Sequence, residues 1–261
     1  MIIVRLSRAL QRQDWLAVAI EAGIVMLGVF LAIQANAFWQ DAQARSREAG
    51  ILQRLTEDLA RDQQSAAVLA RLYERRASQA RFLIESLETP SGASEDPCET
   101  ARAVLSTGFV RRAEFNYLAY EEMKAAGDLD FLHDWNVRIE IDDYYLDVAP
   151  DSLTSQAHLF QANLFNRYAT QALTPDQIDE LSGRTEEETS ACALSAEDGL
   201  AIMDRLRASE EATQILPALY AEHVRQVRRL EGYGRRASQL REQLLALQAG
   251  NRDAADAESA P

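Results

Sequence analysis

The sequence predicts an all-α protein with a single N-terminal transmembrane helix. Two observations indicate this class. A stretch of 23 residues, 16–38, contains one charged residue, Glu21, and the remaining chain is rich in helix-forming residues with only 11 Gly and 6 Pro. Apolar residues recur every three or four positions, which favours helices over strands. We expect the span to continue into a long stalk helix, followed by a helical bundle or hairpin domain and a long C-terminal helix packed back on the stalk.

These elements divide the chain into six segments. They are a short basic cytoplasmic tail (1–15), the transmembrane helix (16–39), a coiled-coil-like stalk helix (40–89), an acidic helical domain (90–212), a long C-terminal helix (213–248) and a disordered tail (249–261). The acidic domain carries 25 acidic and 9 basic residues, and the whole chain has a formal net charge of −14. Such a surface repels nucleic acid, so no nucleic-acid partner is expected.

The apolar segment 16–38 has the length of a membrane span. As a helix it is about 34 Å long, against a bilayer core of about 30 Å. Trp15 and Trp39 flank it where interfacial aromatic residues are expected. A cleaved signal peptide is the alternative, because Ala35-Asn36-Ala37 has the form of a cleavage site. The length of the segment and the charge of Glu21 favour a retained anchor, so one membrane is an expected partner.

The orientation of the span depends on the size of its two flanks. Three arginines lie close to each side: Arg5, Arg8 and Arg12 before it, and Arg45, Arg47 and Arg54 after it. A short basic tail resists crossing, whereas long domains cross largely regardless of charge. We therefore expect a bacterial inner (cytoplasmic) membrane protein with its N-terminus in the cytoplasm and its main domain in the periplasm.

One face of the predicted span carries small residues together with its acid. At 100° per residue, Glu21, Gly28, Ala32 and Ala35 fall on one stripe. Small residues let a second helix approach closely in lipid, so the stripe predicts a homo-oligomer formed through the span. Glu21 would then be shielded from lipid. Alternatively, Glu21 reaches back to the headgroups, and the sequence leaves both interpretations open.

The stalk carries a seven-residue repeat. One core position holds Leu52, Leu59, Ala66, Tyr73, Ala80 and Leu87, and the other holds Leu55, Leu69 and Leu83. Asp62 and Arg76 interrupt the repeat. This pattern predicts helix packing. The stalk pairs either with the helix 213–248 in antiparallel fashion or with a second stalk in a parallel dimer, and the two arrangements can coexist.

The middle of the chain reads as shorter helices separated by stop signals. They are expected over about residues 97–108, 115–126, 131–148 and 150–173, with two more beginning at Pro175 and after Ser195. Gly127 ends the second of these helices, and Asp128 or Asp130 is expected to cap the third. This spacing predicts a helical hairpin.

The chain has two cysteines, Cys98 and Cys192. Two are too few for a disulfide framework or a zinc site. They would form one bridge if the domain faces an oxidising compartment. Otherwise they are two ordinary helix residues, and the sequence does not decide between these interpretations.

The densest aromatic cluster lies in the predicted hairpin. It includes Tyr117, Tyr120, Trp135, Tyr144 and Tyr145, which form either the core of the hairpin or the lining of a ligand cleft. His133 lies near several acids, but the spacing matches no metal-ligand motif. Neither a nucleophile motif nor a Gly-rich phosphate loop occurs. We therefore expect no catalytic residue, no cofactor and no metal.

Three blocks of the sequence are similar to a family. They are Gln34-Ala-Asn36-Ala-Phe38-Trp39, Leu52-Gln-Arg-Leu55-Thr-Glu-Asp58-Leu59 and Tyr120-Glu-Glu-Met-Lys-Ala-Ala-Gly127. Together they resemble an uncharacterised bacterial family of single-pass membrane proteins with a domain of unknown function. The resemblance covers about residues 15–150. It implies a retained anchor, a helical stalk and a hairpin, and it transfers no chemistry.

The sequence leaves two functional hypotheses. The first is a membrane-anchored, non-enzymatic helical interaction or scaffold protein of the bacterial envelope, which binds an unidentified envelope protein or copies of itself through span and stalk. The second is a periplasmic small-molecule-sensing module that signals through a membrane partner, with the aromatic hairpin as its ligand site.

Overall fold

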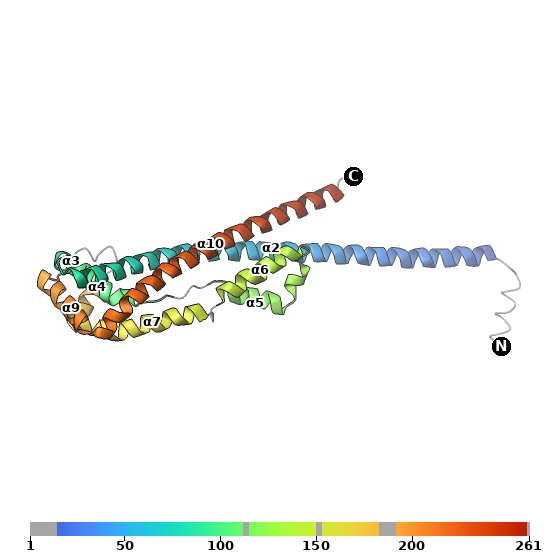
Figure 1. Ribbon diagram of the computed structural model, residues 1–261. Coiled ribbons are helices and arrows are strands. Elements are labelled where there is room, and N and C mark those ends of the chain that lie inside the picture. The colour runs from blue at the N-terminus through green and yellow to red at the C-terminus, as the bar shows by residue number, and fades with distance from the viewer. Residues whose placement is uncertain (1–14, 112–114, 150–152, 183–191, 260–261) are drawn as a thin grey trace, which may run out of the picture. The chain divides into compact units, whose positions relative to one another are not determined.

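The computed structural model describes residues 15–111, 115–149, 153–182 and 192–259, and each regular element in these ranges is a helix (Figure 1). The α-helices are α2 (Trp15–Glu88), α3 (Ser91–Glu95), α4 (Pro97–Thr107), α5 (Tyr117–Ala125), α6 (Trp135–Val148), α7 (Leu153–Ala169), α8 (Pro175–Ser182), α9 (Ala196–Ala208) and α10 (Glu210–Ser259). Two short 3₁₀ helices, η1 (Asp128–Phe131) and η2 (Thr170–Ala172), complete the described part. The predicted all-α fold is confirmed.

The chain divides into two units, residues 1–51 and 52–261, and α2 contributes to both. In the first unit, α2 exposes large apolar side chains in every direction. Ile24, Phe30 and Trp39 are examples, and each is exposed over more than half of its surface. This helix is long and apolar enough to cross a membrane. A helix that is apolar on all sides is typical of a buried or a membrane-spanning segment, and its own unit does not cover this one.

In the second unit, α2 and α10 pack against each other in antiparallel fashion. Arg81 Nη2 donates to the hydroxyl of Tyr220 over 2.9 Å. Later in α10 and earlier in α2, a Cβ added at Gly234 would lie 3.6 Å from the Cβ of Ala66. The contacts therefore move backwards along α10 as they advance along α2. The predicted pairing of the stalk with the C-terminal helix is confirmed, and its repeat residues Leu52, Leu55, Leu59, Ala66, Leu69, Tyr73, Ala80 and Leu83 are buried.

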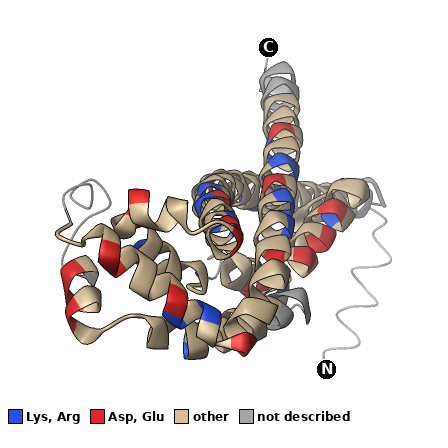
Figure 2. Cartoon of the chain, turned by 60° about the vertical axis from the view of Figure 1, so that its left-hand side comes forward, with Lys and Arg blue, Asp and Glu red and all other residues tan. Residues whose placement is uncertain are grey.

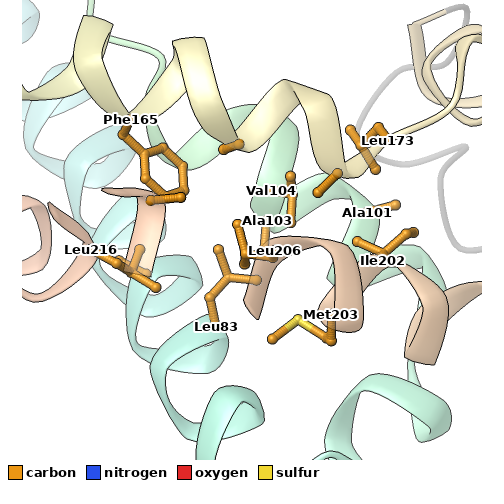
Figure 3. Packing of buried hydrophobic residues seen from close by; sticks show 14 of the residues in the cluster. Leu83, Ala101, Ala103, Val104, Phe165, Leu173, Ile202, Met203, Leu206 and Leu216 are labelled. Carbon is orange, nitrogen blue, oxygen red and sulfur yellow. The ribbon is translucent and has the colours of Figure 1, made fainter. Parts of the chain in front are cut away.

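A second core lies where the end of α2 meets α4, α7, α9 and the start of α10. Leu83, Val104, Phe165, Ile202 and Leu216 are each fully buried in it (Figure 3). These five helices contribute to one cluster of aliphatic and aromatic side chains, to which α3 adds Ala93 and α8 adds Leu181. Burial of this kind is the main stabilising contribution in a helical bundle, because amphipathic helices gain most of their stability from packing.

The hairpin helix α6 begins later than the sequence predicts. Asp134 caps it by accepting hydrogen bonds from Asn136 N at 2.9 Å and Val137 N at 3.3 Å. The expected caps Asp128 and Asp130 lie instead in η1, and the prediction of a helix from residue 131 is therefore wrong. The 3₁₀ turn follows Gly127, whose φ of 72° suits glycine, and it buries Leu129.

The C-terminal helix continues beyond its predicted end. We expected residues 249–261 to be a disordered tail, but α10 extends to Ser259. Residues 251–259 contain neither Gly nor Pro, and Ala is their commonest residue. Extending an existing helix costs far less than starting one, so good helix formers carry it onward. Before this extension, Lys and Arg lie close to Asp and Glu along α10, the helix that ends at C (Figure 2).

Candidate functional site

The most distinctive polar site of the second unit surrounds Asp62, one of the two interruptions of the stalk repeat. Its carboxylate is fully buried. Oδ1 accepts hydrogen bonds from the backbone N and the Nδ2 of Asn116, both at 2.8 Å. Oδ2 accepts one from the hydroxyl of Tyr144 at 3.2 Å. The acid that breaks the repeat thus ties α2 to the start of α5 and to α6.

Burial raises the pKa of Asp62, and the hydrogen bonds from Asn116 and Tyr144 oppose that rise. One turn earlier, Asp58 is also buried and forms an ion pair with Arg61. The amide of Asn116 additionally donates to the Asp58 carbonyl at 3.2 Å. These contacts fix the position of the hairpin along α2, because a one-turn shift would leave buried donors and acceptors without partners.

Three of the five predicted aromatic residues, Tyr120, Tyr144 and Tyr145, are fully buried beside this acid. The rings of Tyr120 and Tyr145 stack with centroids 4.5 Å apart, and Tyr145 meets Tyr144 edge to face at 5.0 Å. Burial, with the charge of Asp62 second, raises the pKa of both Tyr144 and Tyr145. Both hydroxyls therefore stay protonated at neutral pH, so Tyr144 remains a hydrogen-bond donor.

The hydroxyl of Tyr120 points to the edge of the hairpin. It donates to the carboxylate of Asp142 and accepts a hydrogen bond from Lys124 Nζ at 2.9 Å. Lys124 and Asp142 also form an ion pair at 3.9 Å. This group joins α5 to α6.

The other two predicted aromatic residues lie outside this interior. Tyr117 is half-buried, 6.3 Å from Tyr120 between ring centroids. Trp135 is 63% exposed, with the guanidinium of Arg138 5.3 Å from its ring centroid. Two open hollows lie elsewhere, one of about 700 Å³ between α6 and α10 and one of about 430 Å³ between α8 and α9, and none of the five predicted aromatic residues lines either of them. The aromatic set predicted from the sequence therefore combines residues of a packed interior with an exposed tryptophan.

A second buried polar group joins α2, α7 and α10. The rings of Tyr73, His158 and His223 lie 5.2 to 5.8 Å apart. His223 Nε2 lies 2.8 Å from the carbonyl of Thr107, and the Tyr73 hydroxyl donates to the carbonyl of Arg111 at 2.7 Å. Burial lowers the pKa of each histidine to about 4 and raises that of Tyr73 to about 12. All three groups are thus neutral at pH 7.

The two cysteines lie together in the structure. Cys98 begins α4, Cys192 lies shortly before α9, and a disulfide joins them with their Cα atoms 6.0 Å apart. That separation is within the range typical of disulfides. The bond connects positions 94 residues apart.

The predicted small-residue stripe of the span lies in the first unit. Gly28, Ala32 and Ala35 are exposed there, and a Cβ at Gly28 would meet nothing within 4 Å. The side chain of Glu21 lies outside the described residues. The face on which the prediction depends is therefore open to a second helix or to lipid.

Among the described residues, no group of three His, Cys, Asp or Glu side chains is arranged to hold a metal ion. Comparisons with known protein families, with curated proteins and with solved structures found no match to this chain. The functional argument therefore depends on the geometry of the chain itself.

Proposed function

We propose that this chain is a membrane-anchored, non-enzymatic helical interaction protein of the bacterial envelope. Its first helix would cross the inner membrane once, with the N-terminus in the cytoplasm. Its helical second unit would face the periplasm and bind another envelope protein. The resemblance to single-pass proteins described above supports the same assignment.

The observation that carries the proposal is the exposed apolar surface of α2 in the first unit. From Ile24 to Ile33, all ten residues are apolar or glycine and all are exposed. In water such a surface would be strongly unfavourable, at roughly 25 cal/mol for each square ångström of apolar area. In lipid it is favourable, and a helix satisfies all of its own backbone hydrogen bonds there.

The disulfide supports a periplasmic second unit. Disulfides persist in the bacterial periplasm and are rare in the cytosol, where thiols are kept reduced. The bond between Cys98 and Cys192 therefore favours an orientation that places the second unit in the periplasm.

The interior of the second unit supports a binding role rather than chemistry. Three of its buried ionisable groups, Asp62, His158 and His223, contact other groups of the fold and line neither described hollow. The hydrogen bonds of Asp62 hold helices in register. An interaction protein requires a rigid surface of this kind, and the surface is where its activity would lie.

Two measurements on the full-length chain test the proposal. In the first, alkaline carbonate should leave the protein in the membrane pellet. In the second, alkaline phosphatase fused to the C-terminus should be active, because that enzyme requires periplasmic disulfides. Recovery in the carbonate supernatant would contradict the anchor. An inactive phosphatase fusion, with an active cytoplasmic reporter at the same site, would contradict the orientation.

A further inference from the structure

The outer face of α6 carries a stripe of large apolar side chains. Trp135, Ile139 and Leu146 are exposed over 63%, 42% and 59% of their surfaces. At 100° per residue these positions fall within an arc of about 40° on the helix. The opposite face is already occupied, because Val137, Ile141, Tyr144, Tyr145 and Val148 are buried. Helix α6 is thus apolar on two sides, and only one of these sides is packed within its unit.

The surroundings of this stripe are strongly acidic. Residues 117–148 contain nine acidic and two basic residues. Asp142 and Asp143 lie between Ile139 and Leu146 along the helix, and Asp143 is exposed next to the stripe. Glu140 lies on the side of α6 that lines the hollow with α10. Both basic residues have acidic partners, because Arg138 pairs with Asp130 at 2.6 Å and Lys124 with Asp142. The stripe therefore lies in a region of net negative charge.

This negative charge favours some binding partners of the apolar stripe over others. A second copy of the hairpin would bring the same excess of acids, and anionic lipid headgroups would also be repelled. A helix with basic residues on either side of an apolar stripe would be attracted and would supply the matching apolar surface.

The chain contains an example of this recognition on the inner side of α6. There α10 lies against α6, the Arg236 guanidinium pairs with the Asp147 carboxylate, and the Tyr233 hydroxyl donates to the Asp147 carbonyl at 2.9 Å. The outward positions Arg228 and Arg235 of α10 are exposed and carry no large apolar neighbour on that face. A second copy of α10 would therefore match the acids of the stripe but not its apolar side chains.

We propose that the face formed by Trp135, Ile139 and Leu146 is the docking site for a cationic amphipathic helix of a partner protein. The inference rests on the proposed function, because it names the surface and the chemistry of that interaction. Three apolar side chains make a small interface, so the affinity expected is micromolar, as in transient complexes.

The test uses the full-length chain in dodecylmaltoside and a fluorescein-labelled peptide of about 18 residues, with leucines at helical spacing and lysines elsewhere. A second peptide has glutamates in place of the lysines. Fluorescence anisotropy should show binding of the lysine peptide and not of the glutamate peptide. The variant W135S/L146S should bind about thirtyfold more weakly, as expected for loss of about 2 kcal/mol at a tryptophan hot spot.

Two variants serve as matched controls. Phe160 on α7 is 68% exposed and lies off the stripe, so F160S should bind the lysine peptide as wild type does. Reversing the exposed acid next to the stripe in D143K should weaken binding about tenfold, because charge pairs across an interface contribute at least 1.4 kcal/mol in favourable cases. The variant D179K makes the same charge change at an exposed position of α8 and should have no effect.

Equal binding of the lysine peptide to all variants, or no binding to wild type at about 100 µM, would overturn the inference. Light scattering that shows a wild-type dimer and a monomeric W135S/L146S would also overturn it, by assigning the stripe to a second copy. If the docking site fails in these ways while carbonate extraction and the phosphatase fusion give the expected results, the proposed function stands and only this partner surface is lost.

Discussion

The hydroxyl of Tyr144 donates a 3.2 Å hydrogen bond to Asp62 Oδ2 and so joins two helices whose contacting residues are 82 positions apart. Asn116 donates twice to the other oxygen of the same carboxylate. A buried acid with three donors stabilises one arrangement of the hairpin on α2, because alternatives leave the charge or the donors unpaired.

Substitution of Asp62 by alanine should therefore destabilise the second unit. Both donors of Asn116 and the hydroxyl of Tyr144 would lose their acceptor, and we expect a loss of about 3 kcal/mol. Tyr144→Phe removes one bond and should cost about 1 kcal/mol. Urea unfolding followed by circular dichroism in detergent measures both. The control Gln63→Ala changes the exposed neighbouring residue on the same helix. If Gln63→Ala lowers the free energy of unfolding as much as Asp62→Ala does, the carboxylate does not have this role.

The close approach of α9 to α3 makes a second prediction. A Cβ at Gly199 would lie 2.0 Å from the carbonyl oxygen of Ala93, so Gly199→Ala should force the helices apart and cost at least about 2 kcal/mol. At Gly232 on α10 a Cβ meets nothing within 4 Å. Gly232→Ala should therefore stabilise by about 0.5 to 1 kcal/mol through helix propensity. Thermal unfolding measures both variants. If Gly199→Ala and Gly232→Ala shift the melting temperature in the same direction, this description of the packing is wrong.

The helical class and most buried stalk positions follow from the sequence, because a seven-residue repeat encodes which face is covered. The repeat does not encode what covers that face, so it leaves open both the C-terminal helix and a second stalk. The partners of Asp62 do not follow from it. The repeat marks that acid as an exception, but its donors come from Asn116 and Tyr144, far away in the chain. Local periodicity carries no information on contacts of this separation.

The histidine group shows the same limit. His158 and His223 are two isolated histidines in sequence, and neither spacing nor motif pairs them. Their meeting depends on how α7 packs on α10. The start of α6 was also mispredicted, because several aspartates compete as caps and the burial of Leu129 in the 3₁₀ turn leaves Asp134 as the cap that is used.

The buried histidines predict that acid weakens the second unit. Each folded-state pKa is lowered to about 4, first by burial, against about 6.5 when unfolded. Between these values the unfolded chain binds more protons, so stability is complete above about pH 6.5 and falls as the pH drops towards 4. At pH 5 each histidine should account for a loss of about 2 kcal/mol in urea unfolding.

Charged groups near the pair act in both directions. Arg225 and Arg229 on α10 and Arg76 on α2 oppose protonation, whereas Glu222 favours it. The variants His158→Gln and His223→Gln should each reduce the difference in stability between about pH 7 and pH 5. His133 is exposed, and the control variant His133→Gln should leave this difference in stability unchanged. An unchanged pH dependence in both buried variants would show that the pair is not responsible.

The disulfide predicts a redox effect on stability. In the chain-entropy account, a bond across 94 residues stabilises the fold by about 4.7 kcal/mol. Non-reducing electrophoresis of freshly purified protein should show a faster band than with reductant. The double variant Cys98→Ser and Cys192→Ser should unfold at lower urea and lose the shift. Free thiols on both residues in alkylated native protein would rule the bond out.

The small-residue stripe of the span predicts self-association in the membrane. Gly28 and Ala32 are exposed, so a second helix can approach them closely, and leucine at either position would keep the two backbones apart. Gly28→Leu and Ala32→Leu should therefore reduce the signal of a membrane two-hybrid reporter, by about 1 kcal/mol or roughly fivefold in the association constant. Leu27→Ala changes a residue on another face and should leave the signal unchanged. If all three variants associate as wild type does, the helix meets lipid on every side and the stripe has no role in pairing.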